Sequence, residues 1–276
     1  MKQIIRGMQI LMYMIFFSVV AQESKKLKIG TEYTIQSEIL EETRSYIISL
    51  PASYYKTKKT YPVLVLSDGD YRFVYTSGLI EYLSKENRIP ETIIVAIPNT
   101  DRTRDLTPTN MAYNSNSGGG KSFLSFIEKE LLTEVDKKFR TNTCRILTGH
   151  SLGGLFAGYA YLSNSTFNAF IATDPSFWWD SQLLVRNINK DLIKNIKHKP
   201  IYISSADDYN NNPQAVNAMR NAHELFSIKL KKHGVPNANI KLEYFADENH
   251  GTSAYRSLYY GLLYVYDTLD LSNIIE

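Results

Sequence analysis

Gly149-His-Ser-Leu-Gly-Gly154 is the stretch that decides the fold. It follows an apolar run, Cys144-Arg-Ile-Leu-Thr148, and leads into Leu155-Phe-Ala-Gly-Tyr-Ala-Tyr-Leu162. This order predicts a strand, a tight turn and a helix, with Ser151 at the apex of the turn. In that setting the spacing Gly-x-Ser-x-Gly is typical of a nucleophile elbow, where glycines leave room for a strained backbone that exposes a serine hydroxyl. The alternative is an ordinary glycine-rich turn with an incidental serine.

The rest of the chain alternates between buried strands and amphipathic helices. Strands are expected at 61–66, 92–97, 144–148, 169–173, 200–205 and 239–245, with helices over 73–86, 121–139, 182–196, 213–233 and 254–269. Two further strands, 32–40 and 44–50, form an antiparallel edge pair, and a long loop spans 98–120. The alternation predicts an α/β protein with a doubly wound, mostly parallel sheet and helices on both faces. Sites in such sheets lie beyond the carboxyl ends of the strands.

The amino terminus has the layout of a secretory signal peptide. Lys2 and Arg6 precede an apolar run from Met8 to Val20, and small residues end at Ala21. The run is too short for a comfortable transmembrane span. We expect cleavage after Ala21, a periplasmic or secreted protein, and a single domain over 22–276; the alternative is an uncleaved anchor.

Charge and cysteine content exclude several classes of partner. The formal net charge is +3, and removing Lys2 and Arg6, with no acidic residue, leaves +1. No basic blocks are present, so nucleic acid is not an expected partner. Cys144 is the only cysteine, which excludes an intramolecular disulfide and a cysteine-based zinc site. Its position in a strand predicts a buried, small apolar residue.

A serine hydroxyl needs a general base, and that base needs an orienting acid. In hydrolases with this elbow the chain order is Ser, then Asp or Glu, then His. His250 follows the last predicted strand and is the expected base, whereas His150 adjoins the serine on the wrong side of the turn and should pack beneath it.

Three aspartates at strand ends are candidates for the acid. Asp208 is preferred because it follows a strand and leaves one helix and one strand before His250; Asp207 comes next, and then Asp174. The aspartates that do not serve as the acid would form turns or cap helices.

An oxyanion hole needs two main-chain N–H groups that point at the tetrahedral intermediate. One donor is expected from Leu152, directly after the serine. The other is expected from the loop after the strand at 61–66, where Gly69, Asp70 and Tyr71 are the candidates.

Several of these motifs together resemble the bacterial putative esterase family. They are Tyr61-Pro-Val-Leu-Val-Leu-Ser-Asp-Gly-Asp70, Asp101-Arg-Thr-Arg-Asp-Leu-Thr-Pro108, the glycine-rich tract before residue 121, Gly149–Gly154 and Asp174-Pro-Ser-Phe-Trp-Trp179. The resemblance is to the esterase D and enterochelin-esterase-like branch of the α/β-hydrolases and covers about residues 30–270. It implies hydrolysis of carboxylic esters by Ser151 and His250 with no metal and no cofactor. Some siderophore-type members resemble a Ser–His dyad, which would make the acid less important.

The residues around the serine suggest a substrate only loosely. Trp178 and Trp179 could stack on an aromatic or sugar group, or pack beneath a loop. Arg102 and Arg104 could hold an anionic ligand, or brace the loop through Asp101 and Asp105. The substrate expected from the resemblance is a small-molecule or carbohydrate ester: a siderophore trilactone, or an acyl or feruloyl ester. The alternatives are an acyltransferase and an idle, ligand-binding member of the same fold.

Overall fold

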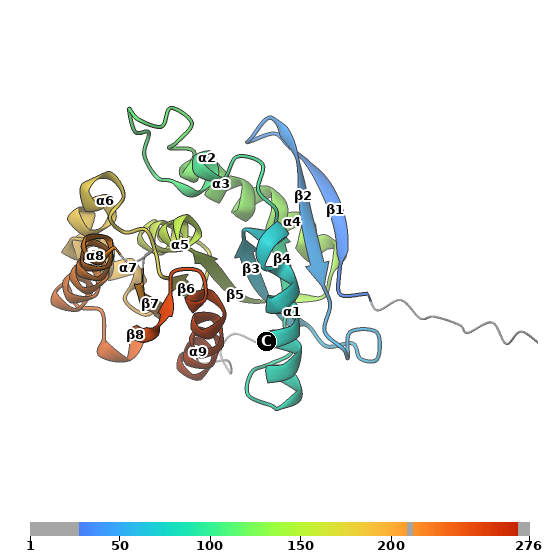
Figure 1. Cartoon of the computed structure of the whole chain (residues 1–276). Coiled ribbons are helices and arrows are strands. Elements are labelled where there is room, and N and C mark those ends of the chain that lie inside the picture. Colours follow the sequence, from blue (N-terminus) through green and yellow to red (C-terminus); the bar gives the residue numbers. More distant parts are fainter. Residues whose placement is uncertain (1–27, 209–211, 270–276) are drawn as a thin grey trace, which may run out of the picture.

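The computed structural model describes residues 28–208 and 212–269, which build an eight-stranded sheet covered by helices (Figure 1). Its spatial order is β1-β2-β4-β3-β5-β6-β7-β8. The strands are β1 Thr31–Ser37, β2 Glu42–Ser49, β3 Tyr61–Ser67, β4 Ile93–Ile97, β5 Thr141–His150, β6 Ala169–Thr173, β7 Ile201–Asp208 and β8 Ile240–Asn249. All neighbours among β3 to β8 are parallel, whereas β2 pairs antiparallel with both β1 and β4. The predicted doubly wound, mostly parallel sheet is confirmed.

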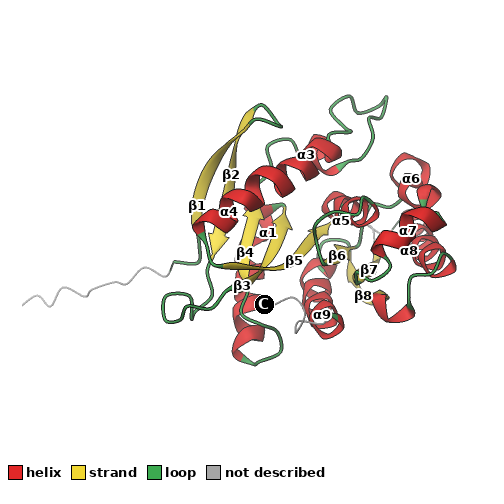
Figure 2. Ribbon diagram, turned by 180° about the vertical axis from the view of Figure 1, so that it is seen from behind, coloured by secondary structure: helices red, strands yellow, loops and turns green. Residues whose placement is uncertain are grey.

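The helices divide between the two faces of this sheet. On one face lie α1 (Gly69–Lys85) and α9 (Ser253–Thr268), side by side in front of the strands in Figure 1. On the other face, turned toward the reader in Figure 2, lie α3 Gly120–Phe126, α4 Leu132–Lys138, α5 Leu152–Leu162, α6 Trp179–Asn187, α7 Lys190–Ile196 and α8 Pro213–Lys232. A π-helical turn, Ile127–Leu131, joins α3 to α4, and a 3₁₀ turn, Asn237–Asn239, precedes β8.

Strand β3 shows why both faces need cover. Its residues are buried throughout, and their side chains alternate between two apolar cores. Val63 and Val65 pack with the helices of the α3–α8 layer, while Leu64 and Leu66 pack with α1 and α9. Each fully buried aliphatic side chain stabilises the fold by about 1.5–3 kcal/mol, so an apolar run of this kind is stable only between two helical layers.

Some elements differ from the sequence-based expectation. Of the two strands expected as an edge pair, only β1 lies at an edge of the sheet, because β2 lies between β1 and β4. A short helix, α2 (Arg102–Leu106), forms inside the expected loop at 98–120. The helix expected at 182–196 is two helices, since the Asn189 side chain accepts hydrogen bonds from the main chain of Asp191 and Leu192 and starts α7 anew.

Three further expectations concern the amino terminus, Cys144 and membrane spans. The predicted signal peptide, residues 1–21, lies outside the described residues. Cys144 is fully buried, as expected, and burial raises the pKa of its thiol to about 12. Across 28–208 and 212–269, no helix combines the length and apolar character that crossing a membrane requires.

Candidate active site

Ser151 stands at a strained turn between β5 and α5. Its backbone has φ 59° and ψ −117°, a conformation that non-glycine residues rarely adopt. Its N–H donates to the Thr173 carbonyl at 3.0 Å, which ties the turn to the end of β6. A Cβ at Gly149 would collide with the main chain of Gly153 and with the Ser67 hydroxyl, as the glycine spacing predicts. The local geometry is that of a nucleophile elbow.

His250, in the loop after β8, is paired with Asp174. Its Nδ1 lies 2.6 Å from Asp174 Oδ2, and the Asp174 side chain is fully buried while the imidazole is about one-third exposed. The last residues of β5 and β6, His150 and Thr173, are register partners. Ser151 and Asp174 therefore follow directly from one pair of adjacent strand ends, which brings the elbow and the carboxylate together.

The carboxylate of Asp174 is held from several sides. Its Oδ1 accepts from the Ala206 N–H at 3.1 Å, and its own N–H donates to Ser204 Oγ at 3.0 Å. Ser257, from α9, donates in turn to Ser204 at 2.6 Å. The backbone of Asp174 lies at φ 40°, so this aspartate, like the serine, occupies a strained position. Such support fixes the orientation of a side chain that must align an imidazole.

The other two aspartates lie in a different setting. Asp207 forms an ion pair with Arg220 of α8 at 2.5 Å and is partly exposed. Asp208 ends β7, where its register partner is Asn249. The geometry therefore favours Asp174, the third choice from the sequence, as the partner of His250. One signal in the sequence pointed to it: Asp174 opens the Asp-Pro-Ser-Phe-Trp-Trp motif.

The amino termini of α1 and α5 supply the candidate oxyanion donors. The Tyr71 N–H donates to the Asp68 carbonyl at 3.0 Å and is committed to the first turn of α1. Gly69 and Asp70 precede it in that turn, and Leu152 is the first residue of α5. First-turn N–H groups have no partner within their own helix and favour negative charge. The candidate oxyanion donors are thus the N–H of Leu152 and that of Gly69 or Asp70.

Asp68, which sequence reasoning missed, fixes this donor loop. It adopts a left-handed conformation (φ 56°) as the residue before α1 and is buried. Arg102 binds both of its carboxylate oxygens, at 2.6 and 3.1 Å, and also donates to the His150 carbonyl at 3.3 Å. Burial alone would raise the pKa of Asp68, but Arg102 together with Asn99 and Arg72 outweighs it and lowers that pKa. Arg102 thus braces the two loops that carry the candidate donors.

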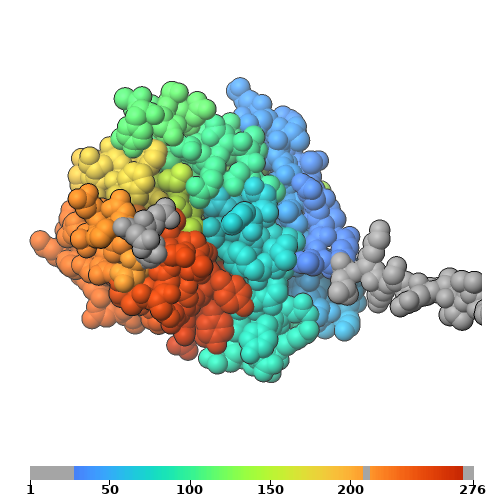
Figure 3. Space-filling model, viewed as in Figure 1, coloured from blue at the N-terminus to red at the C-terminus, as the bar shows by residue number. Residues whose placement is uncertain are grey.

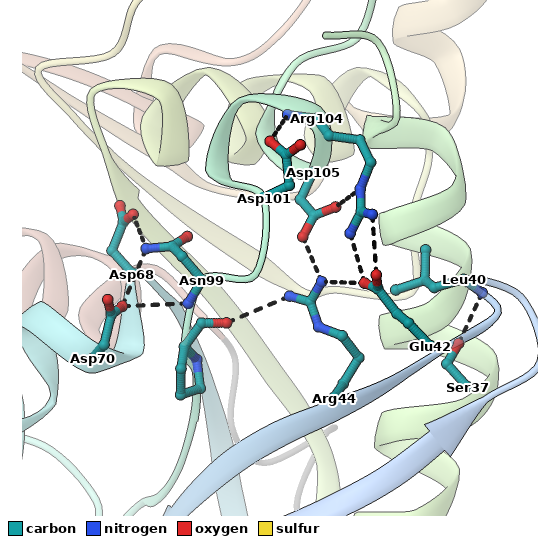
Figure 4. A network of polar contacts seen from close by, with 11 residues as sticks. Ser37, Leu40, Glu42, Arg44, Asp68, Asp70, Asn99, Asp101, Arg104 and Asp105 are labelled. Carbon is teal, nitrogen blue, oxygen red and sulfur yellow. Dashed lines mark hydrogen bonds and ion pairs between the residues drawn. The ribbon is translucent and has the colours of Figure 1, made fainter. Parts of the chain in front are cut away.

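Arg104 takes part in a separate network that anchors the amino-terminal hairpin (Figure 4). It contacts Glu42 at 2.6 Å and Asp105 at 2.7 Å, and the hydrogen bond to Glu42, then that to Asp105, raises its pKa. The buried Arg44 binds the same two carboxylates, at 2.9 and 2.6 Å. Asp101 accepts instead from the Arg104 main chain. Arg104 therefore braces the loop against β2, with Glu42 and Asp105 as its partners.

The two tryptophans have different surroundings. Trp179 is buried and donates from Nε1 to Thr109 at 3.1 Å, so it packs beneath the 98–120 loop. Trp178 is 42% exposed, and its ring centroid lies 6.0 Å from that of Trp179. Ser176, another residue that sequence reasoning missed, is buried with its hydroxyl 3.4 Å from that of Ser151.

One group among the described residues has ligand atoms close enough for a metal ion: His150, Asp174 and His250, within 4.8 Å of one another. The Nδ1 of His150 accepts a hydrogen bond from the Arg72 guanidinium at 2.5 Å. A fixed positive charge at that distance opposes a metal cation. The hydrogen bonds of the group suit acid–base chemistry instead.

A surface cavity of about 780 Å³ lies at the opposite end of the strands. Residues 87–90, Lys241 at the start of β8, and α9 residues line it. It contains none of the residues at the elbow, so its size does not make it the candidate site.

The parallel sheet, the elbow and the His250–Asp174 pair define an α/β-hydrolase. Residues 37–250 match the putative esterase family, and the chain belongs to that family. It is similar to the IroE-like serine hydrolase of Shewanella oneidensis, with 31% identity, a TM-score of 0.76, and coverage of 86% of this chain and 80% of that one.

Curated relatives are similar over shorter stretches. Ferri-bacillibactin esterase BesA of Bacillus subtilis is 28% identical over 182 residues, covering 57% of this chain and 62% of BesA. The siderophore triacetylfusarinine C esterase of Aspergillus fumigatus is 39% identical over 83 residues, covering 29% of this chain and 28% of that enzyme. The chain thus spans less than two thirds of the length of the curated relatives it matches.

Proposed function

We propose that the protein is a serine carboxylesterase that works through an acyl-serine intermediate. The observation that carries this proposal is the strained Ser151 turn next to His150, whose ring centroid is 4.4 Å from that of His250, while His250 Nδ1 is 2.6 Å from a buried aspartate. A serine hydroxyl at neutral pH requires such a base, and the aspartate holds the base in the useful tautomer.

In the first half-reaction Ser151 Oγ attacks the ester carbonyl carbon while its proton passes to His250 Nε2. The carbonyl oxygen becomes an oxyanion, which the N–H of Leu152 and that of Gly69 or Asp70 stabilise; each such donor contributes on the order of 3 kcal/mol. Collapse of the intermediate breaks the bond to the alkoxide, which takes the proton from His250 and leaves as an alcohol. Asp174 stays ionised and bonded to His250 Nδ1–H throughout.

In the second half-reaction water attacks the acyl-serine. His250 takes a proton from the water and returns it to Ser151 Oγ, which releases the carboxylic acid. With an alcohol or sugar in place of water the same steps would transfer the acyl group, so product analysis with an acceptor present separates hydrolysis from transfer.

For the substrate, we propose an ester of a siderophore, because two relatives carry that activity in their names. The discriminating experiment compares an enterobactin-type trilactone, iron-loaded and iron-free, with feruloylated and acetylated xylan fragments, and identifies the products by mass spectrometry. Preferential release of a feruloyl or acetyl group would contradict the siderophore assignment.

The test of the serine mechanism is Ser151→Ala, assayed with p-nitrophenyl butyrate and with a fluorophosphonate probe. Ser163→Ala is the matched control, since Ser163 is an exposed serine at the far end of the same helix. We expect Ser151→Ala to abolish both turnover and labelling, and Ser163→Ala to retain both. Undiminished turnover by purified Ser151→Ala would refute the mechanism.

We also propose that the protein is exported, on the basis of the signal-peptide layout of residues 1–21. Mass spectrometry of the protein from the exported fraction should give a mature chain that begins at Gln22. A chain that still begins at Met1 would contradict cleavage.

A further inference from the structure

A second histidine, His150, is buried beside the proposed base and held at both ring nitrogens. Arg72 lies 2.5 Å from its Nδ1, and the main-chain carbonyl of His250 lies 2.6 Å from its Nε2. A guanidinium has only donors and a carbonyl oxygen only accepts. Nδ1 must therefore be the acceptor and Nε2–H the donor, which fixes one neutral tautomer.

The three residues come from distant parts of the chain. Arg72 belongs to the first turns of α1, His150 ends β5, and His250 precedes α9. Arg72 lies 78 residues before His150 in the chain, and His250 lies 100 residues after it. The two helices meet on one face of the molecule, where the teal α1 and the red α9 form a continuous surface (Figure 3). The contact at His150 thus joins β5 to the α1–α9 layer directly behind the elbow.

Arg72 is itself fixed in place. It is buried, donates to the Tyr75 hydroxyl at 2.8 Å and lies 3.7 Å from Asp68. The Asp68 carboxylate, which also binds Arg102, partly offsets the guanidinium charge of Arg72, which is costly at a buried position. An arginine constrained in this way acts as a rigid donor to the imidazole.

The contact from His150 bears on the main chain of the proposed base. The His250 carbonyl accepts from His150 Nε2 and, at 3.1 Å, from Ser253 Oγ, while the His250 ring is oriented by Asp174. A displacement of about 1 Å in a reacting group can cost roughly 10²-fold in rate. A hydrogen bond that holds the base at its main chain therefore affects the rate without touching the substrate.

The charge state of His150 also suits this position. The ring centroids of His150 and His250 are 4.4 Å apart, and His250 becomes positive in each half-reaction. Burial, then the charge of Arg72, lowers the pKa of His150 to about 3. The other charged groups at this position are Asp68 from the loop before α1, Asp174 from the end of β6, and Arg102 from α2, which donates to the His150 carbonyl. His150 stays neutral and does not oppose the imidazolium.

We propose that His150 is a positioning residue that holds the main chain of His250 through Nε2–H, with Arg72 selecting its tautomer. This inference rests on the proposed function, since it assigns His250 as the base.

Two substitutions distinguish the hydrogen bond donated by His150 Nε2–H from simple packing of the His150 side chain. His150→Gln places an amide nitrogen near the original Nε2, whereas His150→Asn ends near Nδ1 and cannot reach the carbonyl. We expect His150→Asn to lower kcat for p-nitrophenyl butyrate roughly 10²-fold at nearly constant KM. His150→Gln should recover to within about tenfold of the unmodified protein, because it loses only the contact with Arg72. The exposed His198→Gln is the matched control and should leave kcat unchanged.

The tautomer and charge of His150 can also be measured directly on the unmodified protein. Nitrogen-15 NMR of the imidazoles should find His150 protonated at Nε2, unprotonated at Nδ1, and neutral between pH 8 and pH 5. An Nδ1–H tautomer, titration within that range, or equal kcat for the Asn and Gln variants would overturn the assignment. Activity that persists in Ser151→Ala would instead remove the proposed function and leave the tautomer measurement standing.

Discussion

Replacing Asp174 with asparagine should remove most of the activity, for a reason that can be worked out from its contacts. The Ala206 N–H is 3.1 Å from Oδ1, so the amide oxygen of the introduced asparagine would take that position. The amide NH₂ would then face His250 Nδ1, where the carboxylate oxygen lies at 2.6 Å in the native protein. A donor at that position forces Nδ1 to accept and places the imidazole proton on Nε2, where the proposed base must be free to take a proton.

The size of the effect follows from the lost charge and the wrong tautomer. A carboxylate and an imidazolium about 4 Å apart attract by about 4 kcal/mol at an effective dielectric constant of about 20. That energy corresponds to about 10³-fold in rate, and the same substitution in the serine protease triad lowers kcat by about 10⁴. We expect kcat/KM for p-nitrophenyl butyrate to fall 10³- to 10⁴-fold, mostly through kcat.

The control for this experiment is Asp207→Asn. Asp207 is partly exposed and pairs with Arg220, and an exposed ion pair stabilises a protein by about 1 kcal/mol or less. Activity should therefore change less than about twofold. Retention of more than a tenth of the activity by Asp174→Asn, or the large loss in Asp208→Asn instead, would refute Asp174 as the partner of the base.

Three further outcomes are expected. Arg102→Gln should lower kcat/KM about 10- to 100-fold, because Asp68, directly before Gly69 and Asp70, loses the arginine that binds both of its carboxylate oxygens. The exposed Arg88→Gln is the control, and equal activity of the two variants would contradict the bracing role of Arg102. The free energy of unfolding, from urea titrations, should fall as the pH drops below 6.5, since the folded state resists protonation of His150 down to about pH 3 while the unfolded chain does not. The loss from this one group should be about 2 kcal/mol between pH 6.5 and 5, and a slope unchanged in His150→Gln would contradict the assignment. Gly153→Ala should destabilise by about 1–3 kcal/mol because its Cβ would collide with the Ser67 hydroxyl, whereas Gly78→Ala, with open space around it, should be neutral or slightly stabilising in thermal melts.

The features that the sequence predicted well depend on neighbours along the chain. The elbow is one such feature, because a strand, two glycines and a helix within a few residues restrict the backbone strongly. The six parallel strands are another, since runs such as Tyr61–Leu66 are apolar on every residue. The position of His250 was also predictable, because it follows the last strand directly and comes after the serine.

The features that were missed depend on contacts across the fold. The sequence pattern placed Asp174, Asp207 and Asp208 at strand ends. It could not predict that His150 pairs with Thr173, and this pairing places Asp174 beside the elbow. Asp68 was missed because its carboxylate is held by Arg102, the first residue of α2, and by Asn99 in the loop before that helix, both about thirty residues away in the chain. Helix α2 has only five residues, too few for its periodicity to be visible.

The positive φ angles of Ser151, Asp174 and Asp68 have a consequence for thermal stability. Each non-glycine residue held there costs of order 1–3 kcal/mol, so the turns at this end of the sheet carry a strained backbone. Ser151→Ala removes the hydroxyl and keeps that cost, whereas Ser151→Gly removes both. The glycine variant should therefore be inactive yet melt a few degrees higher than the alanine variant, as expected where a protein gives up stability for activity.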